Sequence, residues 1–134
     1  MTGPLVAGVG FRRGTSADEI VALIASALAQ VGAGPTDLAA IATASDRAAE
    51  PPIRSAAARF ALTPAAVAAD VLEASAARVV TRSERVARLR GVGSLAEAAA
   101  LAVAGPESRL ALPRIASGGA TCALAVRTNT KPAA

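Results

Sequence analysis

The first 44 residues of the chain carry a short apolar run, an amphipathic pattern and a second short apolar run, in that order. The apolar runs, residues 4–11 and 38–44, predict buried strands. Between them, Ser16 and Glu19 have the spacing of a helix capping box, and apolar residues then recur at helical intervals, which predicts a helix over 16–31. A strand, a helix and a strand in this order predict a parallel pair of strands, and hence an α/β fold.

The following segments continue the alternation. Residues 50–62 predict a helix that opens with prolines. Residues 83–91 and 94–105 each run from a serine to a glycine, which is typical of a capped helix. In the second of these segments, Ser94 and Glu97 repeat the capping-box spacing.

The C-terminal part of the chain predicts a β-hairpin. Two strand-like runs are joined by a short turn: residues 109–115 and 120–127, with 116–119 between them. Residues 62–80 leave two possibilities open, an alanine-rich helix alone or one that follows a short strand near Val67. With 134 residues, the chain fits a single domain over 1–134, in which 127–134 form a flexible tail.

Composition restricts the chemistry that is open to the chain. It is 53% hydrophobic but only 1% aromatic, and its arginines are dispersed, so nucleic-acid binding is not expected. The formal net charge of +4 permits an anionic partner without requiring one. With no histidine and one cysteine, Cys122, the chain lacks the side chains of a metal centre, and we expect no metal and no cofactor. Cys122 lies in an apolar run and is predicted to be a core residue.

Targeting signals are absent from the sequence. The N-terminus has no basic region followed by an apolar run and a cleavage site, and no apolar stretch approaches the ~20 residues that span a bilayer. We therefore expect a cytoplasmic protein without membrane contact. The oligomeric state is left open.

The loop after the first predicted strand contains Gly8, Gly10 and Gly14 together with Arg12 and Arg13. The glycine spacing is one residue longer than in the dinucleotide-binding fingerprint, and the lysine that ends a phosphate-binding P-loop is missing. Free backbone N–H groups at a helix start, the helix dipole and two guanidinium groups nevertheless favour an anion. In the alternative interpretation, the glycines only form the turn and both arginines are solvated.

The arginine loop belongs to the first of four ordered motifs, which together cover nearly the whole chain. "VAGVGFRRGTSADEI", "IATASDRAAEPPI", "TRSERVARLRGVGSLAEAAAL" and "LPRIASGGATCALA" lie within residues 6–126. In order and spacing, the chain resembles the cobalamin-biosynthesis family formed by stand-alone CobE proteins and the C-terminal domain of CbiG. The resemblance implies a three-layer α/β/α domain with a mixed, mostly parallel sheet, acting in construction of the corrin ring.

The candidate ligand-binding residues combine matches to these motifs with neighbouring polar groups: Gly8, Gly10, Arg12, Arg13, Gly14, Thr15, Thr43, Arg47, Glu50, Ser83, Gly91, Gly93, Arg114, Ser117, Gly118 and Thr121. Further matches are not assigned to binding: Glu19, Pro51, Val86, Glu97 and Ala98. We assign the two glutamates of that second group to their capping boxes. The chain departs from the family at Ser45 and Ala49, where acidic residues are expected, and at Arg114, where lysine is frequent.

The resemblance implies a precorrin or corrin intermediate as the partner. Such a macrocycle is large, apolar and fringed with carboxylates, so its site needs cationic groups and backbone donors around an apolar floor. Four arginines are predicted near strand ends, where ligands of open α/β sheets gather, and we expect them to clamp the carboxylates: Arg12, Arg13, Arg47 and Arg114.

Two functions remain open. In the first, the protein binds the intermediate as a carrier, chaperone or accessory factor, with other enzymes of the cobalamin pathway as further candidate partners. In the second, it hydrolyses a precorrin, because longer CbiG-type relatives are associated with opening a lactone. Glu50 is then the one candidate general base. The sequence favours binding, since it offers no nucleophile paired with a base and no metal ligands.

Overall fold

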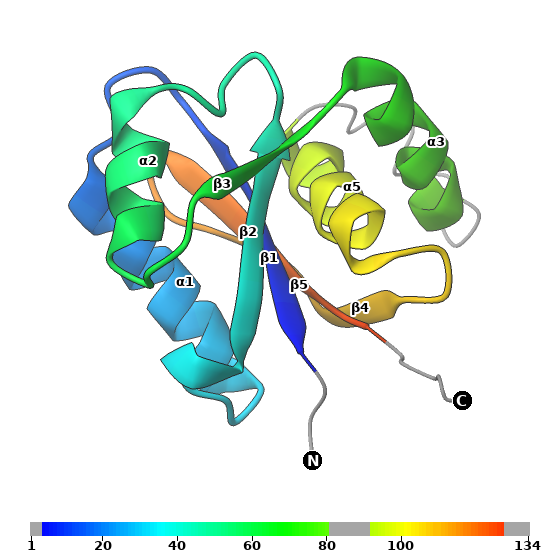
Figure 1. Ribbon diagram of the computed structural model, residues 1–134, viewed down its shortest axis with the longest axis horizontal. Coiled ribbons are helices and arrows are strands. Elements are labelled where there is room, and N and C mark those ends of the chain that lie inside the picture. The colour runs from blue at the N-terminus through cyan, green and yellow to red at the C-terminus, as the bar shows by residue number, and fades with distance from the viewer. Residues whose placement is uncertain (1–3, 81–91, 128–134) are drawn as a thin grey trace.

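The computed structural model describes residues 4–80 and 92–127 of the chain. These residues form a five-stranded sheet with helices on both faces (Figure 1). The strands are β1 (Leu5–Phe11), β2 (Leu38–Ala44), β3 (Pro64–Val67), β4 (Arg109–Ala116) and β5 (Ala120–Val126). The helices are α1 (Ala17–Gln30), the single 3-10 turn η1 (Pro35–Asp37), α2 (Pro51–Ala58), α3 (Ala69–Val80) and α5 (Val92–Ala104). The helix predicted over 83–91 and the tail at 128–134 lie outside the described residues.

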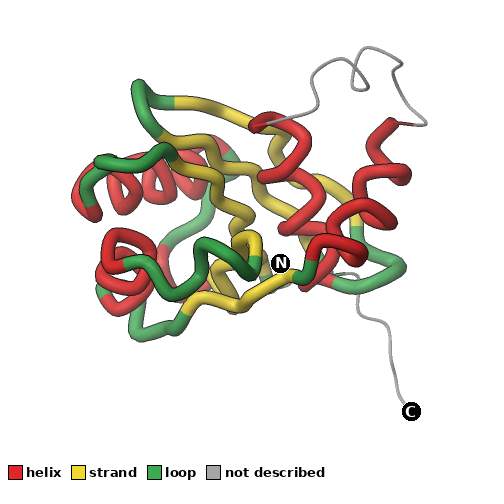
Figure 2. Tube along the Cα trace, turned by 90° about the horizontal axis from the view of Figure 1, so that it is seen from above, coloured by secondary structure: helices red, strands yellow, loops and turns green. Residues whose placement is uncertain are grey.

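The sheet is the middle of three layers. Helices α1 and α2 pack on one face, while α3 and α5 pack on the other, and Figure 2 shows the strands between them. Along β1, Ala7 and Val9 face the first pair of helices and Val6 faces the second, as the alternation of side chains in a strand requires. The three-layer α/β/α fold is therefore confirmed.

The strand order is β3-β2-β1-β5-β4. Strand β2 is parallel to β1 and β3, whereas β5 is antiparallel to β1 and β4. The mixed sheet and the C-terminal hairpin are confirmed, since four of the five strands run in the same direction and β5 alone runs against them. Both strands of the hairpin join the sheet, so β5 has an antiparallel neighbour on each side.

The elements predicted from local patterns are found at or near their expected ends. Strand β2 has the predicted bounds, and α1 begins after Ser16, whose side chain accepts a hydrogen bond from the Glu19 N–H at 3.1 Å. The segment 62–80 contains both elements that were considered, since β3 pairs with β2 before α3 begins. Glu50 is the residue before α2, without a capping hydrogen bond from its side chain, so it does not lie in the first turn.

The start of α5 differs from its prediction. The helix begins at Val92, two residues before the predicted start at Ser94. The Glu97 carboxylate accepts from the backbone N–H of Arg114 in β4, at 3.1 Å. This partner on a distant strand was not expected from the spacing of a serine and a glutamate.

Helix α5 lies unusually close to β1. A Cβ atom at Gly8 would be 2.0 Å from the carbonyl oxygen of Ala96 and 2.7 Å from the nitrogen of Ala100. Small residues on the helix and a glycine in the strand therefore allow backbone to meet backbone, which explains how the alanine-rich core on this face of the sheet packs without an aromatic side chain among its described residues. In the described parts of the chain, no helix is both long and apolar enough to cross a membrane.

Candidate functional site

Three loops meet at one edge of the sheet, which we call the carboxyl edge. Strands β1 and β2 both end there, and they are followed by residues 12–16 and 45–50. Because β5 runs antiparallel to β1, with Phe11 opposite Ala120, the hairpin turn at residues 117–119 lies at the same edge. The topology thus brings together segments from the two ends of the described chain, at the position where α/β sheets usually bind their ligands.

Two arginines on the first of these loops are open to solvent. Arg12 and Arg13 are exposed, and neither guanidinium forms a hydrogen bond or ion pair with any residue in the described ranges. Their backbone is well held, since the Arg12 N–H donates to the Gly119 carbonyl at 2.8 Å. Gly14 has a φ of 89°, a left-handed conformation that favours glycine, and so it permits the turn into α1. The loop thus presents two exposed cations on a fixed backbone.

The hairpin turn is joined to this loop by Glu19. Its Oε2 accepts from the Ser117 hydroxyl and, at 2.7 Å, from the Gly119 N–H, while Thr15 Oγ1 donates to the Gly119 carbonyl at 3.0 Å. The hydrogen bonds from Ser117 and Gly119 lower the pKa of Glu19. The capping-box assignment of Glu19 was therefore right for its N–H, which donates to Ser16, but wrong for its carboxylate, which binds the hairpin turn.

Gly119, which is not among the predicted binding residues, allows the hairpin turn to approach Thr15 and Glu19 closely. A Cβ atom there would lie 2.5 Å from Thr15 Oγ1 and 3.5 Å from Glu19 Oε2. The neighbouring Gly118, which was in the set, is exposed at the turn, with space around it. The two adjacent glycines were a signal for a tight turn, but nothing local indicated that the turn would contact α1.

Arg47 belongs to the second loop, and its side chain reaches Phe11, the residue before the first loop. Its guanidinium carbon is 4.6 Å from the centre of the Phe11 ring, and Nη2 donates to the Phe11 carbonyl. Nη1 lies 3.5 Å from Oε2 of Glu50, and the two side chains are 25% and 34% exposed. A cation held over a ring and against a carbonyl keeps a defined orientation. The structure thus brings Arg47 and Glu50 to the same edge as Arg12 and Arg13.

Four of the predicted site residues lie inside the sheet. Thr43 is 0% exposed and donates from Oγ1 to the Val9 carbonyl at 2.8 Å, and the buried Thr121 donates to the Gly10 carbonyl at 3.5 Å. Gly8 and Gly10 are within β1, where Gly8 faces α5. These residues join strands and helices below the carboxyl edge. Packing within the fold therefore accounts for their presence.

The remaining predicted residues lie elsewhere. Arg114 is exposed, two residues before the end of β4, and β5 separates this outer strand from β1. Gly93 belongs to the first turn of α5. Ser83 and Gly91 lie outside the described residues. The expected cluster of four arginines is therefore three arginines on adjoining loops, with the fourth on the outer strand.

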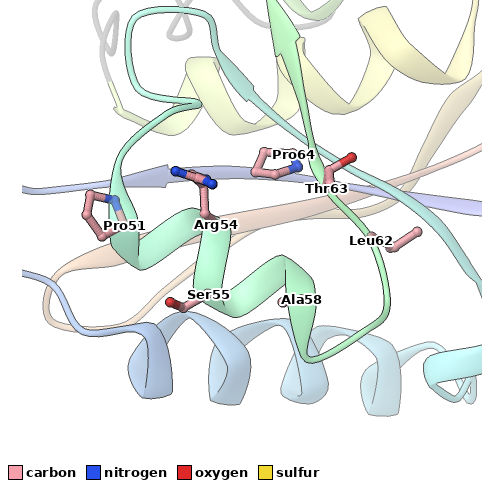
Figure 3. Close-up of a pocket in the computed structure, with 7 residues that line it drawn as sticks. All are labelled: Pro51, Arg54, Ser55, Ala58, Leu62, Thr63 and Pro64. Atoms are coloured by element: carbon pink, nitrogen blue, oxygen red, sulfur yellow. The ribbon is translucent and has the colours of Figure 1, made fainter.

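An open hollow between α2 and β3 was not predicted. It has a volume of about 400 Å³ and is lined by Pro51, Arg54, Ser55, Ala58, Leu62, Thr63 and Pro64 (Figure 3). None of these belongs to the candidate binding set. Because the hollow arises where a helix packs beside the outermost strand, no local pattern in the sequence could have indicated it.

Cys122 is confirmed as a core residue. It is fully buried in β5, and burial raises the pKa of its thiol to about 12. A thiol that stays protonated at neutral pH is a poor nucleophile. It does not contribute to the chemistry of the carboxyl edge.

Fold and edge together define a three-layer α/β domain that carries arginines on adjoining loops at one edge of its sheet. Residues 5–125 match the family model for the cobalamin synthesis G C-terminus. The chain belongs to this family, as its motifs indicated, and it is a cobalamin biosynthesis protein of the CobE and CbiG C-terminal type.

Relatives support this assignment in sequence and in structure. Protein CobE from Sinorhizobium sp. is 45% identical over 121 residues, which cover 90% of this chain and 79% of that protein. A crystal structure of CobE, a protein from the cobalamin (vitamin B12) biosynthetic pathway, superposes with a TM-score of 0.79 and 32% identity, covering 94% of this chain and 92% of that chain. The cobalamin biosynthesis protein chiG from Agrobacterium tumefaciens gives a TM-score of 0.74 and 34% identity over 93% and 99% of the two chains.

Proposed function

We propose that the protein binds a precorrin or corrin intermediate at the carboxyl edge, through the ligand's carboxylates, and acts as a carrier, chaperone or accessory factor. The observation that carries the proposal is the pair of exposed guanidinium groups of Arg12 and Arg13, which have no partner among the described residues and lie beside the partly exposed Arg47. Membership of a cobalamin biosynthesis family supports a tetrapyrrole as the ligand.

The chemistry of the edge suits such a ligand. Each arginine presents a planar fork that can hold a carboxylate through two parallel hydrogen bonds. Val71, in the first turn of α3, is 44% exposed, and α3 follows the end of β3, which pairs with the end of β2. This apolar side chain offers a contact for the face of a macrocycle, close to loops that hold its charged rim.

Binding without chemistry is the function that the described residues favour. A hydrolase would need Glu50 as general base, yet this carboxylate faces the guanidinium of Arg47. Cys122 is buried in the core. In a carrier role, the protein would also contact other enzymes of the pathway, because these would deliver or receive the intermediate.

A titration of the protein with cobyrinic acid, a corrin polycarboxylate, tests the proposal. Cobinamide, in which amides replace the peripheral carboxylates, serves as the comparison without their negative charges. Amino-acid side chains do not absorb visible light, so the visible spectrum of the corrin can be followed directly. Cobyrinic acid should bind, and cobinamide should bind much more weakly.

Charge reversal identifies the site. The variant Arg12→Glu/Arg13→Glu should lose at least about tenfold in affinity, because two charge-assisted contacts become repulsive. Arg109→Glu/Arg127→Glu is the matched control, since both residues lie at the opposite edge of the sheet, beside Val126 and Pro4. Equal affinities of the two folded variants would refute the clamp. Mass spectrometry of a precorrin intermediate incubated with the protein separates the functions, since an unchanged mass supports a carrier and a protein-dependent change supports the hydrolase.

A further inference from the structure

We propose that Glu50 is an internal placeholder. In the free protein its carboxylate pairs with the guanidinium of Arg47, and on binding it gives way to a carboxylate of the ligand. The position therefore selects carboxylates over amides. The inference rests on the proposed function of the carboxyl edge. It assigns Glu50 a role in specificity in place of the catalytic role considered from the sequence.

Arg47 is prepared for a carboxylate before any ligand arrives. The Phe11 ring lies against one side of its guanidinium, at 4.6 Å from the centroid, and Nη2 donates to the Phe11 carbonyl. With the side chain 25% exposed, part of the guanidinium still faces solvent. The orientation of the cation is thus set by β1 and does not depend on Glu50.

Glu50 holds this cation only loosely. The distance of 3.5 Å between Nη1 and Oε2 exceeds the usual range for an N–H···O hydrogen bond. The Glu50 side chain is 34% exposed and caps no backbone N–H of α2. A partly exposed pair of this kind contributes little, because water and salt screen it. A ligand carboxylate that makes two direct hydrogen bonds would therefore replace it.

The loop keeps its shape when Glu50 moves away. Its backbone is closed by hydrogen bonds from the Arg47 N–H to the Ala44 carbonyl at 2.9 Å and from the Glu50 N–H to the Arg47 carbonyl at 3.0 Å. These bonds do not involve the carboxylate of Glu50. Its displacement is therefore a side-chain movement, whereas a neutral amide on the ligand would leave the ion pair in place.

The variant Glu50→Gln tests the placeholder by removing the competing charge. We expect it to bind cobyrinic acid about two- to fivefold more tightly than the unmodified protein, with binding of cobinamide unchanged. Asp46→Asn is the matched control. It removes the same charge from the same loop, and Asp46 forms no ion pair with the described residues. The affinity of Asp46→Asn for cobyrinic acid should therefore rise less than that of Glu50→Gln.

The outcomes separate this inference from the proposed function. Tighter binding of cobyrinic acid by Glu50→Gln than by Asp46→Asn supports the placeholder. Equal affinities of these variants, or weaker binding by Glu50→Gln, refute it and leave the clamp intact. Failure of cobyrinic acid to bind either the unmodified protein or Glu50→Gln refutes both proposals.

Discussion

Replacing Gly8 by alanine places a methyl group against the backbone of α5. The new Cβ would lie 2.0 Å from the Ala96 carbonyl oxygen, whereas ordinary contact begins at 3.4 Å, so the helix would have to move by about 1.4 Å. Overpacking of a core costs about 1–3 kcal/mol, and backbone yields less readily than a side chain. We therefore expect a loss of about 3 kcal/mol or more.

Urea unfolding measures this loss, and thermal unfolding should show a fall in Tm of about 10 °C. Gly34→Ala is the matched control, because Gly34 has a φ of −120° and no atom lies within 4 Å of its Cβ position. Its stability should stay within about 1 kcal/mol of the unmodified protein. A loss of less than about 1 kcal/mol for Gly8→Ala would refute the packing role and return Gly8 to the candidate binding residues.

Two further predictions concern titratable groups. The lowered pKa of Glu19 means that its carboxylate stabilises the fold above the ordinary value of 4.5, and that this contribution is lost as the pH falls toward the folded pKa. Urea unfolding from neutral to acidic pH should therefore show a weaker pH dependence for Glu19→Gln, and an unchanged dependence would contradict the contact with Ser117. Cys122, with its pKa raised to about 12, should resist iodoacetamide in the folded protein and react once urea unfolds it. Rapid labelling of the native protein would contradict its burial.

Local patterns were sufficient where the partner of a residue is close in sequence. Ser16 caps α1 three residues before Glu19, and the apolar run of β2 has the predicted ends. The same reasoning did not find the partner of Glu97, because its carboxylate accepts from the backbone N–H of Arg114 on a strand that packs beside the helix.

The candidate site was predicted in part. The exposure of Arg12 and its place after the first strand follow from the pattern of glycines and the helix start. The contact of Glu19 with the 117–119 turn does not, since it joins positions about a hundred residues apart. Nor could a list of motif residues distinguish the buried Thr43 from those that face solvent.

The alternation of strands and helices and the supply of arginines follow from the amino-acid sequence, because periodicity and capping depend on neighbouring residues. The packing of the whole chain sets β5 beside β1, antiparallel to it, so that the hairpin turn contacts the loop of Arg12 at the same edge of the sheet as the loop of Arg47. Strand order depends on how distant apolar faces are buried together, and several orders satisfy the same local pattern. The chemistry of the carboxyl edge is a product of that packing.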